Sequence, residues 1–172
     1  MVPSLPSRIP DFEDGKKSSQ AAASAVEAKF AGAVLERRSF REEETLLVAT
    51  DRLVEIAAYL KNDPAHAFIY LTDVMASHWL EREYEYQVSY LLCSMKNNAL
   101  IRLEVRVRSG HGPNRVPTLS GVWGTANWQE REEWDKVGVI FDGHPNLKRI
   151  LMPDDWEGHP LRKDYPVEGI GA

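Results

Sequence analysis

The feature that constrains the fold most is a pair of alternating stretches between residues 84 and 108. In the first stretch, large apolar residues occupy every second position: Tyr84, Tyr86, Val88, Tyr90 and Leu92. In the second stretch, apolar residues again alternate, now with charged ones: Ile101, Leu103, Val105 and Val107. A period of two is that of a β-strand with one buried face. With a turn around Lys96-Asn97-Asn98, the two stretches predict a β-hairpin.

The residues before the hairpin predict a helix and a pair of strands. An alanine-rich stretch from Gln20 to Ala31 favours a short helix with one narrow apolar stripe. Two strands are predicted to follow, over Val34 to Phe40 and Thr45 to Ala49, joined by an acidic turn at Glu42-Glu43-Glu44.

A second helix is predicted to start at Thr50 or Asp51 and to end at Asn62-Asp63-Pro64. Its apolar residues fall at helical spacing: Leu53, Ile56, Ala57 and Leu60. The apolar run Phe68 to Leu71 then favours a strand that is covered on both faces and lies centrally in the sheet.

This order of elements predicts an α+β fold, with a mainly antiparallel sheet and helices on one face. We expect an α+β domain over residues 20–108, preceded by a disordered leader at residues 1–19, where prolines and polar residues dominate. Residues 109–172 are expected to form a helix plus an extended segment that docks on a partner.

The C-terminal third combines helix breakers with large apolar side chains. A helix is predicted from Ala126 to Val137, with Asn127, Glu130 and Trp134 on one face. Beyond it, frequent glycines and prolines prevent long regular elements. The same stretch is too apolar for a solvated linker because it contains Ile150, Leu151, Met152, Trp156, Leu161 and Tyr165. Such side chains need a surface, either of this domain or of a partner.

Composition excludes several functional classes. The net charge of -5 argues against nucleic-acid binding, which needs a clustered excess of Lys and Arg. The single cysteine, Cys93, cannot form an internal disulfide and is too few for an iron-sulfur cluster or a structural zinc site. The sequence has neither a membrane-spanning apolar window nor a signal peptide pattern. We therefore expect a cytoplasmic protein in a reducing compartment, associated with the membrane only through partners.

Two groups of titratable residues could suggest an enzyme. Glu130-Arg131-Glu132 resembles a pair of catalytic acids, although an ion-pair or capping network on a helix is the more ordinary interpretation. His144 and His159, with nearby acids at 142, 154 and 155, could suggest a metal site, but their spacing matches no common ligand pattern. A stand-alone hydrolase or metal enzyme using these histidines and acids is the alternative function.

The remaining reactive or aromatic residues have simple structural interpretations. Cys93 is expected to be a small buried residue rather than a reactive thiol. The strand tyrosines are expected in the core rather than stacked on a base or quinone. His66, His78 and His111 are expected to be exposed. Residues 162–164 could hold a lipid headgroup, but pairing with a neighbouring protein is favoured.

One stretch resembles a known family. The matching residues are Ala126-Asn127-Trp128-Gln129-Glu130-Arg131-Glu132, Phe141, Gly143-His144-Pro145, Leu147-Lys148-Arg149-Ile150-Leu151, Pro153, Trp156 and Pro160-Leu161-Arg162-Lys163-Asp164-Tyr165. They are similar to the signature of the C subunit of bacterial NADH-quinone oxidoreductase, respiratory complex I, and of its counterpart, the J subunit, in the photosynthetic NDH complex. One departure is Lys136-Val137, where the family usually has an aromatic or aliphatic pair.

The resemblance implies a non-redox subunit of a proton-translocating complex, bound to the cytoplasmic side of the cell inner membrane. It implies that the chain has no catalytic residues, cofactor or metal, because FMN, iron-sulfur clusters and quinone lie on partner subunits. The implied partners are the D and B subunits of the same complex, together with other peripheral-arm subunits. The residues expected to dock on them are Trp128, Glu130, Arg131, Glu132, His144, Pro145, Arg149, Trp156, Leu161, Arg162, Lys163, Asp164 and Tyr165.

Overall fold

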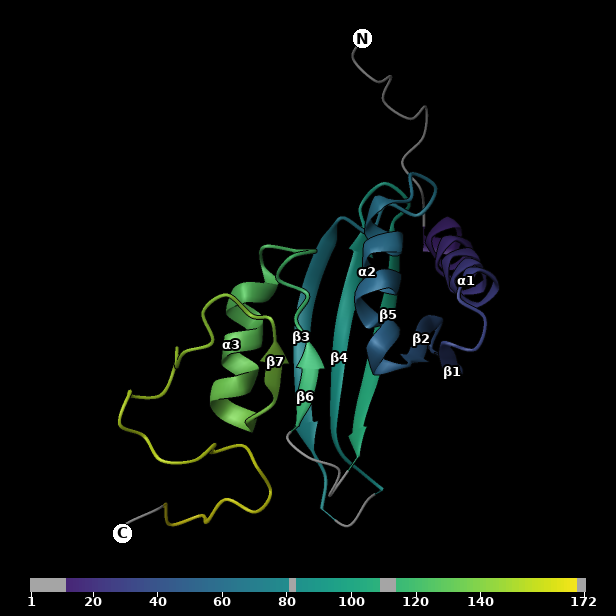
Figure 1. Ribbon diagram of the computed structural model, residues 1–172. Coiled ribbons are helices and arrows are strands. Elements are labelled where there is room, and N and C mark those ends of the chain that lie inside the picture. Colours follow the sequence, from purple (N-terminus) through teal and green to yellow (C-terminus); the bar gives the residue numbers. More distant parts are fainter. Residues whose placement is uncertain (1–11, 81–82, 109–113, 170–172) are drawn as a thin grey trace.

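The computed structural model describes residues 12–80, 83–108 and 114–169. A five-stranded sheet with the order β1-β2-β5-β4-β3 forms its centre (Figure 1). The strands are β1 (Val34–Phe40), β2 (Glu43–Val48), β3 (Tyr70–His78), β4 (Tyr84–Ser94) and β5 (Ala99–Arg108). The pairs β1–β2, β3–β4 and β4–β5 are antiparallel, whereas β2 and β5 are parallel. The predicted α+β class with a mainly antiparallel sheet is confirmed.

The predicted hairpin is the pair β4–β5. Its register places Tyr90 opposite Leu103 and Leu92 opposite Ile101, and all four side chains are buried. The alternate positions, such as Arg102, lie on the other face of the sheet. The core positions predicted for the strand tyrosines are confirmed for Tyr86 and Tyr90, whereas Tyr84 is only half-buried.

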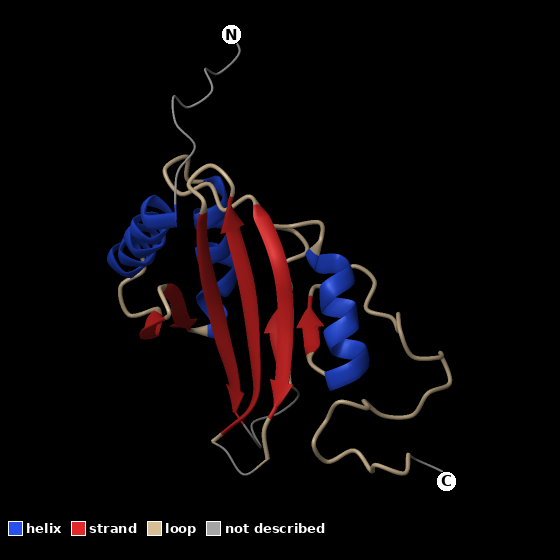
Figure 2. Cartoon of the chain, turned by 180° about the vertical axis from the view of Figure 1, so that it is seen from behind, coloured by secondary structure: helices blue, strands red, loops and turns tan. Residues whose placement is uncertain are grey.

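Two helices cover one face of the sheet. The helix α2 (Leu53–Asn62) follows a short 3-10 turn, η1 (Thr50–Arg52), and buries the four apolar residues predicted for it: Leu53, Ile56, Ala57 and Leu60. The helix α1 (Phe12–Lys29) packs beside it and against β2 and β5. Among the described residues, no helix lies on the opposite face of the sheet (Figure 2). The prediction that the helices cover one face of the sheet is confirmed for α1 and α2.

The helix α1 begins earlier than the sequence predicted. It starts at Phe12 rather than Gln20, so the prediction of a disordered leader is wrong for residues 12–19, while residues 1–11 lie outside the described residues. Small residues make this extension possible. Ser19 is buried, and a Cβ on Gly15 would lie 2.0 Å from the backbone oxygen of Asn98. The helix therefore needs glycine at this position in order to approach the β4–β5 turn.

The turn between β1 and β2 is shorter than predicted. Arg41 and Glu42 form it with φ angles of 48° and 71°, and Glu43 and Glu44 already belong to β2. Two consecutive residues with positive φ are typical of the tight turns that match the twist of antiparallel strands. Glu44 is buried beneath α1, where its carboxylate accepts a hydrogen bond from Arg37 at 2.8 Å.

The strand predicted at the centre of the sheet lies at its edge. β3 starts at Tyr70, so of the predicted run Phe68 to Leu71 only the last two residues are in the strand. The helix α3 (Ala126–Val137) packs against this edge and uses polar side chains to satisfy it. Glu133 accepts the Ala76 N–H at 2.8 Å, and the Gln129 amide donates to the Thr72 carbonyl at 3.1 Å. These contacts occupy backbone groups that an uncovered edge strand would offer to another chain.

The hydrophobic core continues beyond the boundary predicted near Arg108. Two short parallel strands, β6 (Arg115–Pro117) and β7 (Ile140–Asp142), lie beside α3. Their residues Val116 and Phe141 are buried in the same cluster as the main sheet, together with Leu119 and Trp123 from the intervening loop. One core therefore joins the region before residue 108 to α3 and β7.

Candidate docking surface on the C-terminal strap

Residues 143–169, here called the strap, contain no helix or strand and follow a series of turns beside α3 (Figure 1). The main anchor of the strap is Asp135, which is fully buried on α3. One oxygen of its carboxylate accepts the backbone N–H groups of Ile150, Leu151 and Met152 at 3.0, 2.8 and 2.9 Å. Arg149 donates to the other oxygen at 2.6 Å. Burial alone would raise the pKa of Asp135, but these donors lower it to about 2.

Two arginines fix the strap through its backbone carbonyls. Besides binding Asp135, Arg149 donates to the carbonyls of Trp156 and Gly158 at 2.6 and 3.1 Å. Arg131 donates to the carbonyls of Lys148 and Arg149 at 3.0 and 2.8 Å. The ion-pair or capping network predicted for Glu130-Arg131-Glu132 is therefore present only in part. Glu132 is ion-paired with Lys136, whereas the Arg131 guanidinium binds strap carbonyls.

The two histidines of the alternative metal site are also backbone anchors. His144 donates from Nε2 to the Asn127 carbonyl at 3.0 Å, and His159 donates from Nδ1 to the Asp135 carbonyl at 3.0 Å. The His159 ring lies against Gly138, the left-handed residue that ends α3. Within the described residues, no group of three or more His, Cys, Asp or Glu side chains is placed to hold a metal ion. The geometry therefore does not bring the residues of the alternative enzyme site together.

A third histidine, His78 at the end of β3, was expected to be exposed and is buried instead. Its Nδ1 accepts the backbone N–H of Lys163 at 2.9 Å, across 85 residues of sequence. Its Nε2 donates to Glu85 at 3.0 Å, and its ring stacks on Tyr86 with 4.7 Å between centroids. Sequence reasoning missed this contact because the covering strap has no local relation to β3.

Two glutamates of α3 have internal roles. Glu130 is fully buried, and its carboxylate accepts the Leu119 N–H at 2.7 Å and the Thr118 hydroxyl. Burial raises the pKa of Glu130 to about 7, although both hydrogen bonds lower it. Burial likewise raises the pKa of Glu133 to about 7. Glu130 therefore fixes the loop before α3, and its buried side chain has no exposed surface that a partner could contact.

The departure at Lys136 is accommodated at the surface of α3. Its ammonium group pairs with the carboxylate of Glu132, one helical turn away. Both side chains are partly exposed. The backbone carbonyl of Lys136 accepts the Leu161 N–H at 2.8 Å and so fixes another point of the strap.

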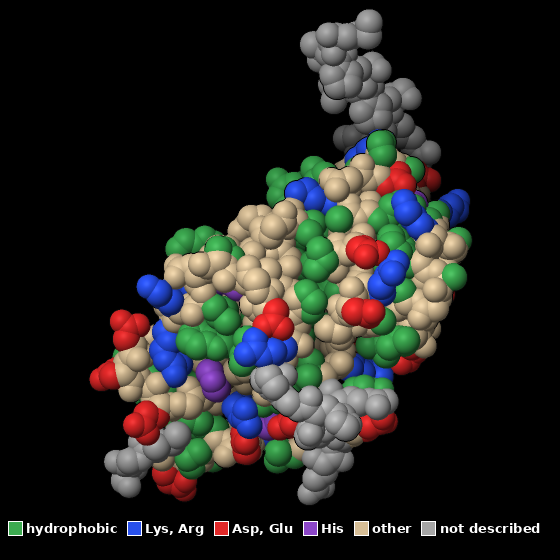
Figure 3. Space-filling model, viewed as in Figure 1, with side chains coloured by type: hydrophobic (Ala, Val, Ile, Leu, Met, Phe, Trp, Pro, Cys, Tyr) green, Lys and Arg blue, Asp and Glu red, His purple; other side chains and the backbone are tan. Residues whose placement is uncertain are grey.

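The outer side of α3 and the strap exposes large apolar side chains. The largest exposed fractions are those of Val167, Trp128, Leu151, Leu161 and Trp156, at 100, 62, 57, 54 and 36%. Hydrophobic and charged side chains intermingle over this part of the molecule (Figure 3). Trp156 and Tyr165 stack with 6.5 Å between ring centroids and border an open hollow of about 590 Å³. This set of exposed residues on α3 and the strap is called the docking surface below.

Most of the other predicted docking residues are also at least partly exposed. Arg162 forms a two-pronged ion pair with Asp164, at 2.8 and 2.7 Å, and its guanidinium lies 5.6 Å from the centroid of the Tyr86 ring. Lys163 and Pro145 are exposed. Twelve of the thirteen predicted docking residues thus keep some exposed surface, with Glu130 the exception.

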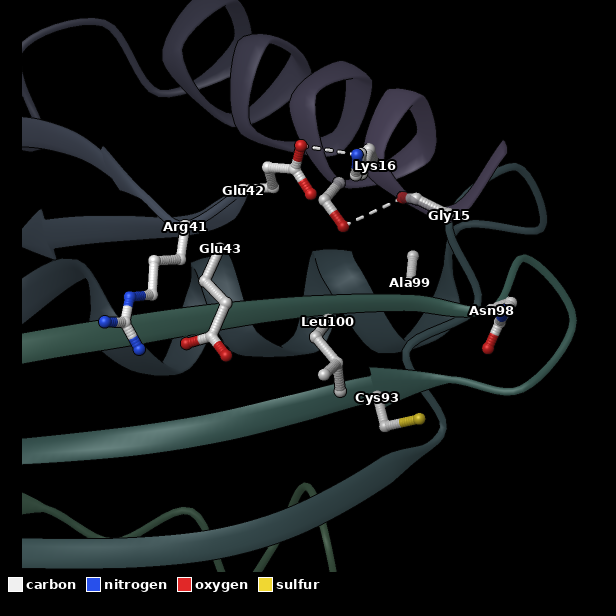
Figure 4. Close-up of a pocket in the computed structure, with 10 residues that line it drawn as sticks. Gly15, Lys16, Arg41, Glu42, Glu43, Cys93, Asn98, Ala99 and Leu100 are labelled. Atoms are coloured by element: carbon white, nitrogen blue, oxygen red, sulfur yellow. Dashed lines mark hydrogen bonds and ion pairs between the residues drawn. The ribbon is translucent and has the colours of Figure 1, made fainter. Parts of the chain in front are cut away.

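A separate hollow of about 370 Å³ contains the cysteine (Figure 4). It lies between the start of α1, the β1–β2 turn and the start of β5, and Leu100 and Cys93 border one side. Cys93 is half-buried rather than buried as predicted, and this burial raises the pKa of its thiol. A raised pKa reduces the thiolate fraction, so the geometry gives no indication of a reactive cysteine.

Comparison with known proteins identifies the family. The model of the 30 kDa subunit of respiratory-chain NADH dehydrogenase matches residues 46–170, a range that contains most of the sheet, α3, and the whole strap. The chain belongs to this family. Every predicted docking residue lies within the matched range.

Curated members of the family are similar over most of their length. The C subunit of the NADH-quinone oxidoreductase of Geotalea uraniireducens is 43% identical over 141 residues, covering 82% of this chain and 84% of that protein. The C subunit of the same enzyme from a Roseiflexus species is 44% identical over 142 residues, covering 83% of this chain and 80% of its own.

Solved structures share the fold. A trypsin-resistant fragment of Nqo5, residues 1 to 134, is 27% identical, with a TM-score of 0.60, covering 76% of this chain and 99% of the fragment. A chain of the membrane-bound sulfane sulfur reductase, an archaeal respiratory membrane complex, has a TM-score of 0.73 at 22% identity. It covers 86% of this chain and 85% of its own length, and at this identity it supports the fold alone.

Proposed function

We propose that this chain is a non-redox structural subunit of a proton-translocating NADH-quinone oxidoreductase. In this proposal it docks beside the large D subunit in the peripheral arm and supports electron transfer from NADH to quinone without taking part in it chemically. Membership of the 30 kDa subunit family supports the assignment to the complex. The docking role rests on one observation, the exposure of large apolar side chains on a strap whose backbone is already fixed.

The strap has the properties of a preorganised interface. Asp135, Arg131 and Arg149 bind its backbone groups, so those groups are satisfied before any partner arrives. Its apolar side chains, in contrast, remain in water, with Leu161 more than half exposed. A backbone that is ordered in advance lowers the entropy lost on binding, and aromatic side chains are frequent anchors of interfaces. This combination favours docking of a protein partner over catalysis.

The redox chemistry is assigned to other subunits in this proposal. FMN, iron-sulfur clusters and quinone are placed on partners, and the D and B subunits are neighbours of each other. The stand-alone enzyme is disfavoured because His144 and His159 each bind a backbone carbonyl. No helix among the described residues is long and apolar enough to span a membrane. We infer peripheral attachment, on the cytoplasmic side, through the complex.

Capture of partner subunits tests this function. The tagged chain is co-expressed with the other subunits of its complex, and the amount of the D subunit is measured after purification from solubilised membranes. Replacing Trp156, Leu161 and Val167 together by serine should reduce capture strongly. If each anchor is buried by the partner, the loss is on the order of 4 kcal/mol, or about a thousandfold in affinity.

A matched control uses equally exposed apolar residues on the helix-free face of the sheet. Phe40, Tyr70 and Leu100 are 74, 56 and 40% exposed, and their triple replacement by serine should leave capture of the D subunit unchanged. Circular dichroism and thermal unfolding confirm that both variants fold. Equal capture by the strap variant and the wild type would contradict the docking role, as would loss of capture in the control variant alone.

A further inference from the structure

We infer that His78 is a positioning residue for the strap, and that protonation of its imidazole releases the strap around Lys163. The consequence for assembly rests on the proposed docking function, whereas the release itself concerns the chain alone. His78 itself lies outside the set of residues that the sequence predicted for docking, and its bond to Lys163 joins the end of β3 to the part of the strap that carries Leu161 and Tyr165.

The hydrogen bonds of His78 define its tautomer. A backbone N–H can only donate, so the bond from Lys163 requires an unprotonated Nδ1. The carboxylate of Glu85 can only accept, so Nε2 carries the proton. The imidazole is therefore neutral, with both nitrogens used. Because the His78 side chain has no exposed surface, water cannot replace either partner without movement of the strap.

Protonation would turn the acceptor at Nδ1 into a donor. Two N–H groups would then face each other at a separation of 2.9 Å, and the contact to Lys163 would be lost. The charged groups that face the ring are Glu85 on β4 and, on the strap, Asp164, whose carboxylate oxygen lies 3.9 Å from Nδ1, and Arg162, which is paired with Asp164.

After protonation, Asp164 is the group that could accept from Nδ1, but only by moving from its present position beyond hydrogen-bond distance. That movement would break the two bonds between Asp164 and Arg162. Tyr86 stacks on the imidazole of His78 but is uncharged near neutral pH. It supplies no alternative acceptor for the Lys163 N–H. The hydrogen bond from Lys163 and the ion pair between Arg162 and Asp164 therefore both depend on an unprotonated Nδ1 of His78.

Amide hydrogen exchange of the isolated full chain tests the release. Exchange rates are measured by NMR from about pH 8 to about pH 5, the range in which imidazoles generally titrate. They are expressed as protection factors, because dividing by the intrinsic exchange rate removes the pH dependence of exchange itself. The Lys163 amide should lose protection about tenfold, the factor that one ordinary hydrogen bond represents. The Met152 amide is an internal control because its acceptor, Asp135, has a pKa of about 2 and stays charged throughout.

Two variants distinguish His78 from other titrating groups. In His78→Asn the amide oxygen can replace Nδ1 as acceptor without titrating, so protection of Lys163 should persist at both pH values. In His78→Phe the ring can still stack on Tyr86, but the acceptor is gone, so Lys163 should be unprotected at both. Glu130 and Glu133 titrate in the same range and are retained in both variants.

If the Lys163 amide of the wild type were equally protected at both pH values, the inference would be overturned. It would also be overturned if His78→Asn lost as much protection at low pH as the wild type, because the effect would then belong to the glutamates. Continued protection in His78→Phe would also overturn it. Capture of the D subunit at the two pH values then tests the consequence for assembly. If the Lys163 amide loses protection at low pH but capture of the D subunit does not change, the result counts against the proposed docking function and not against the role of His78.

Discussion

Replacing Asp135 by asparagine should destabilise the protein more than any other single isosteric change on α3. The substitution keeps the size of the side chain but removes its charge from a site where four donors converge. Asparagine also places an amide N–H₂ where one carboxylate oxygen now accepts. At least one donor of the strap or of Arg149 is then left without a partner in a buried site.

The magnitude follows from the pKa of Asp135. The fall from 3.8 to about 2, in spite of burial, corresponds to about 2 kcal/mol in favour of the folded protein with a charged carboxylate. An unsatisfied buried donor adds about 1 to 3 kcal/mol. We therefore expect Asp135→Asn to lower the free energy of unfolding by about 3 to 5 kcal/mol at neutral pH.

Urea unfolding followed by circular dichroism measures this loss. Glu132→Gln is the matched control, because Glu132 is partly exposed and its pair with Lys136 is worth at most about 0.5 kcal/mol. The pKa of Asp135 is depressed on folding, so its contribution is present above about pH 4 and is lost as the pH falls through about 2. The difference in unfolding free energy between Asp135→Asn and the wild type should therefore become smaller as the pH falls from about 4 to about 2. A loss below about 0.5 kcal/mol at neutral pH would refute this reasoning.

Two further predictions concern α3. The raised pKa of Glu130, about 7, means that its contribution to stability is complete below about pH 4.5 and is lost as the pH rises through about 7. Glu130→Gln should therefore flatten the dependence of the unfolding free energy on pH between about 5 and 8, and an unchanged slope relative to the wild type would contradict this. Gly138→Ala should cost about 1 to 3 kcal/mol in thermal unfolding, since φ is 86° and the added Cβ would lie 2.7 Å from the His159 ring. Stability equal to that of the wild type would show that the end of α3 can relax.

Local periodicity was sufficient to predict much of the fold. The alternation around Tyr90 and Leu103 defined the hairpin because one face of each strand is buried. The spacing of Leu53, Ile56 and Leu60 defined α2 for the same reason. Such patterns can be predicted because a single element contains the whole signal.

Contacts between distant segments were not predictable in this way. The first turns of α1 look polar, and distant contacts hold them: the β4–β5 turn packs against Gly15, and Glu42 in the β1–β2 turn pairs with Lys16. The position of β3 at the edge depends on α3, whose Glu133 binds the backbone of Ala76. Contacts between segments far apart in the sequence leave no local pattern. The polar composition of residues 1–19 therefore suggested a disordered leader, and the apolar run Phe68 to Leu71 suggested a central strand.

The candidate site was predicted only in part. Family resemblance identified the region of the strap, and Trp156 and Leu161 are exposed as a docking role requires. Their anchors, Asp135 and His78, were missed. A single acid at the end of a helix and a single histidine at the end of a strand have ordinary surface interpretations, and only the folded strap brings backbone N–H groups to them.

The docking surface itself is tested most directly by site-specific cross-linking in membranes. A photoreactive amino acid replaces Leu161 on the strap or, in the control, Leu100 on the helix-free face of the sheet; the two side chains are 54 and 40% exposed. After illumination of the assembled complex, the cross-linked partners are identified by mass spectrometry. We predict that position 161 cross-links to the D subunit and that position 100 does not. Cross-linking of the D subunit from position 100 alone would contradict the assignment of docking to the strap.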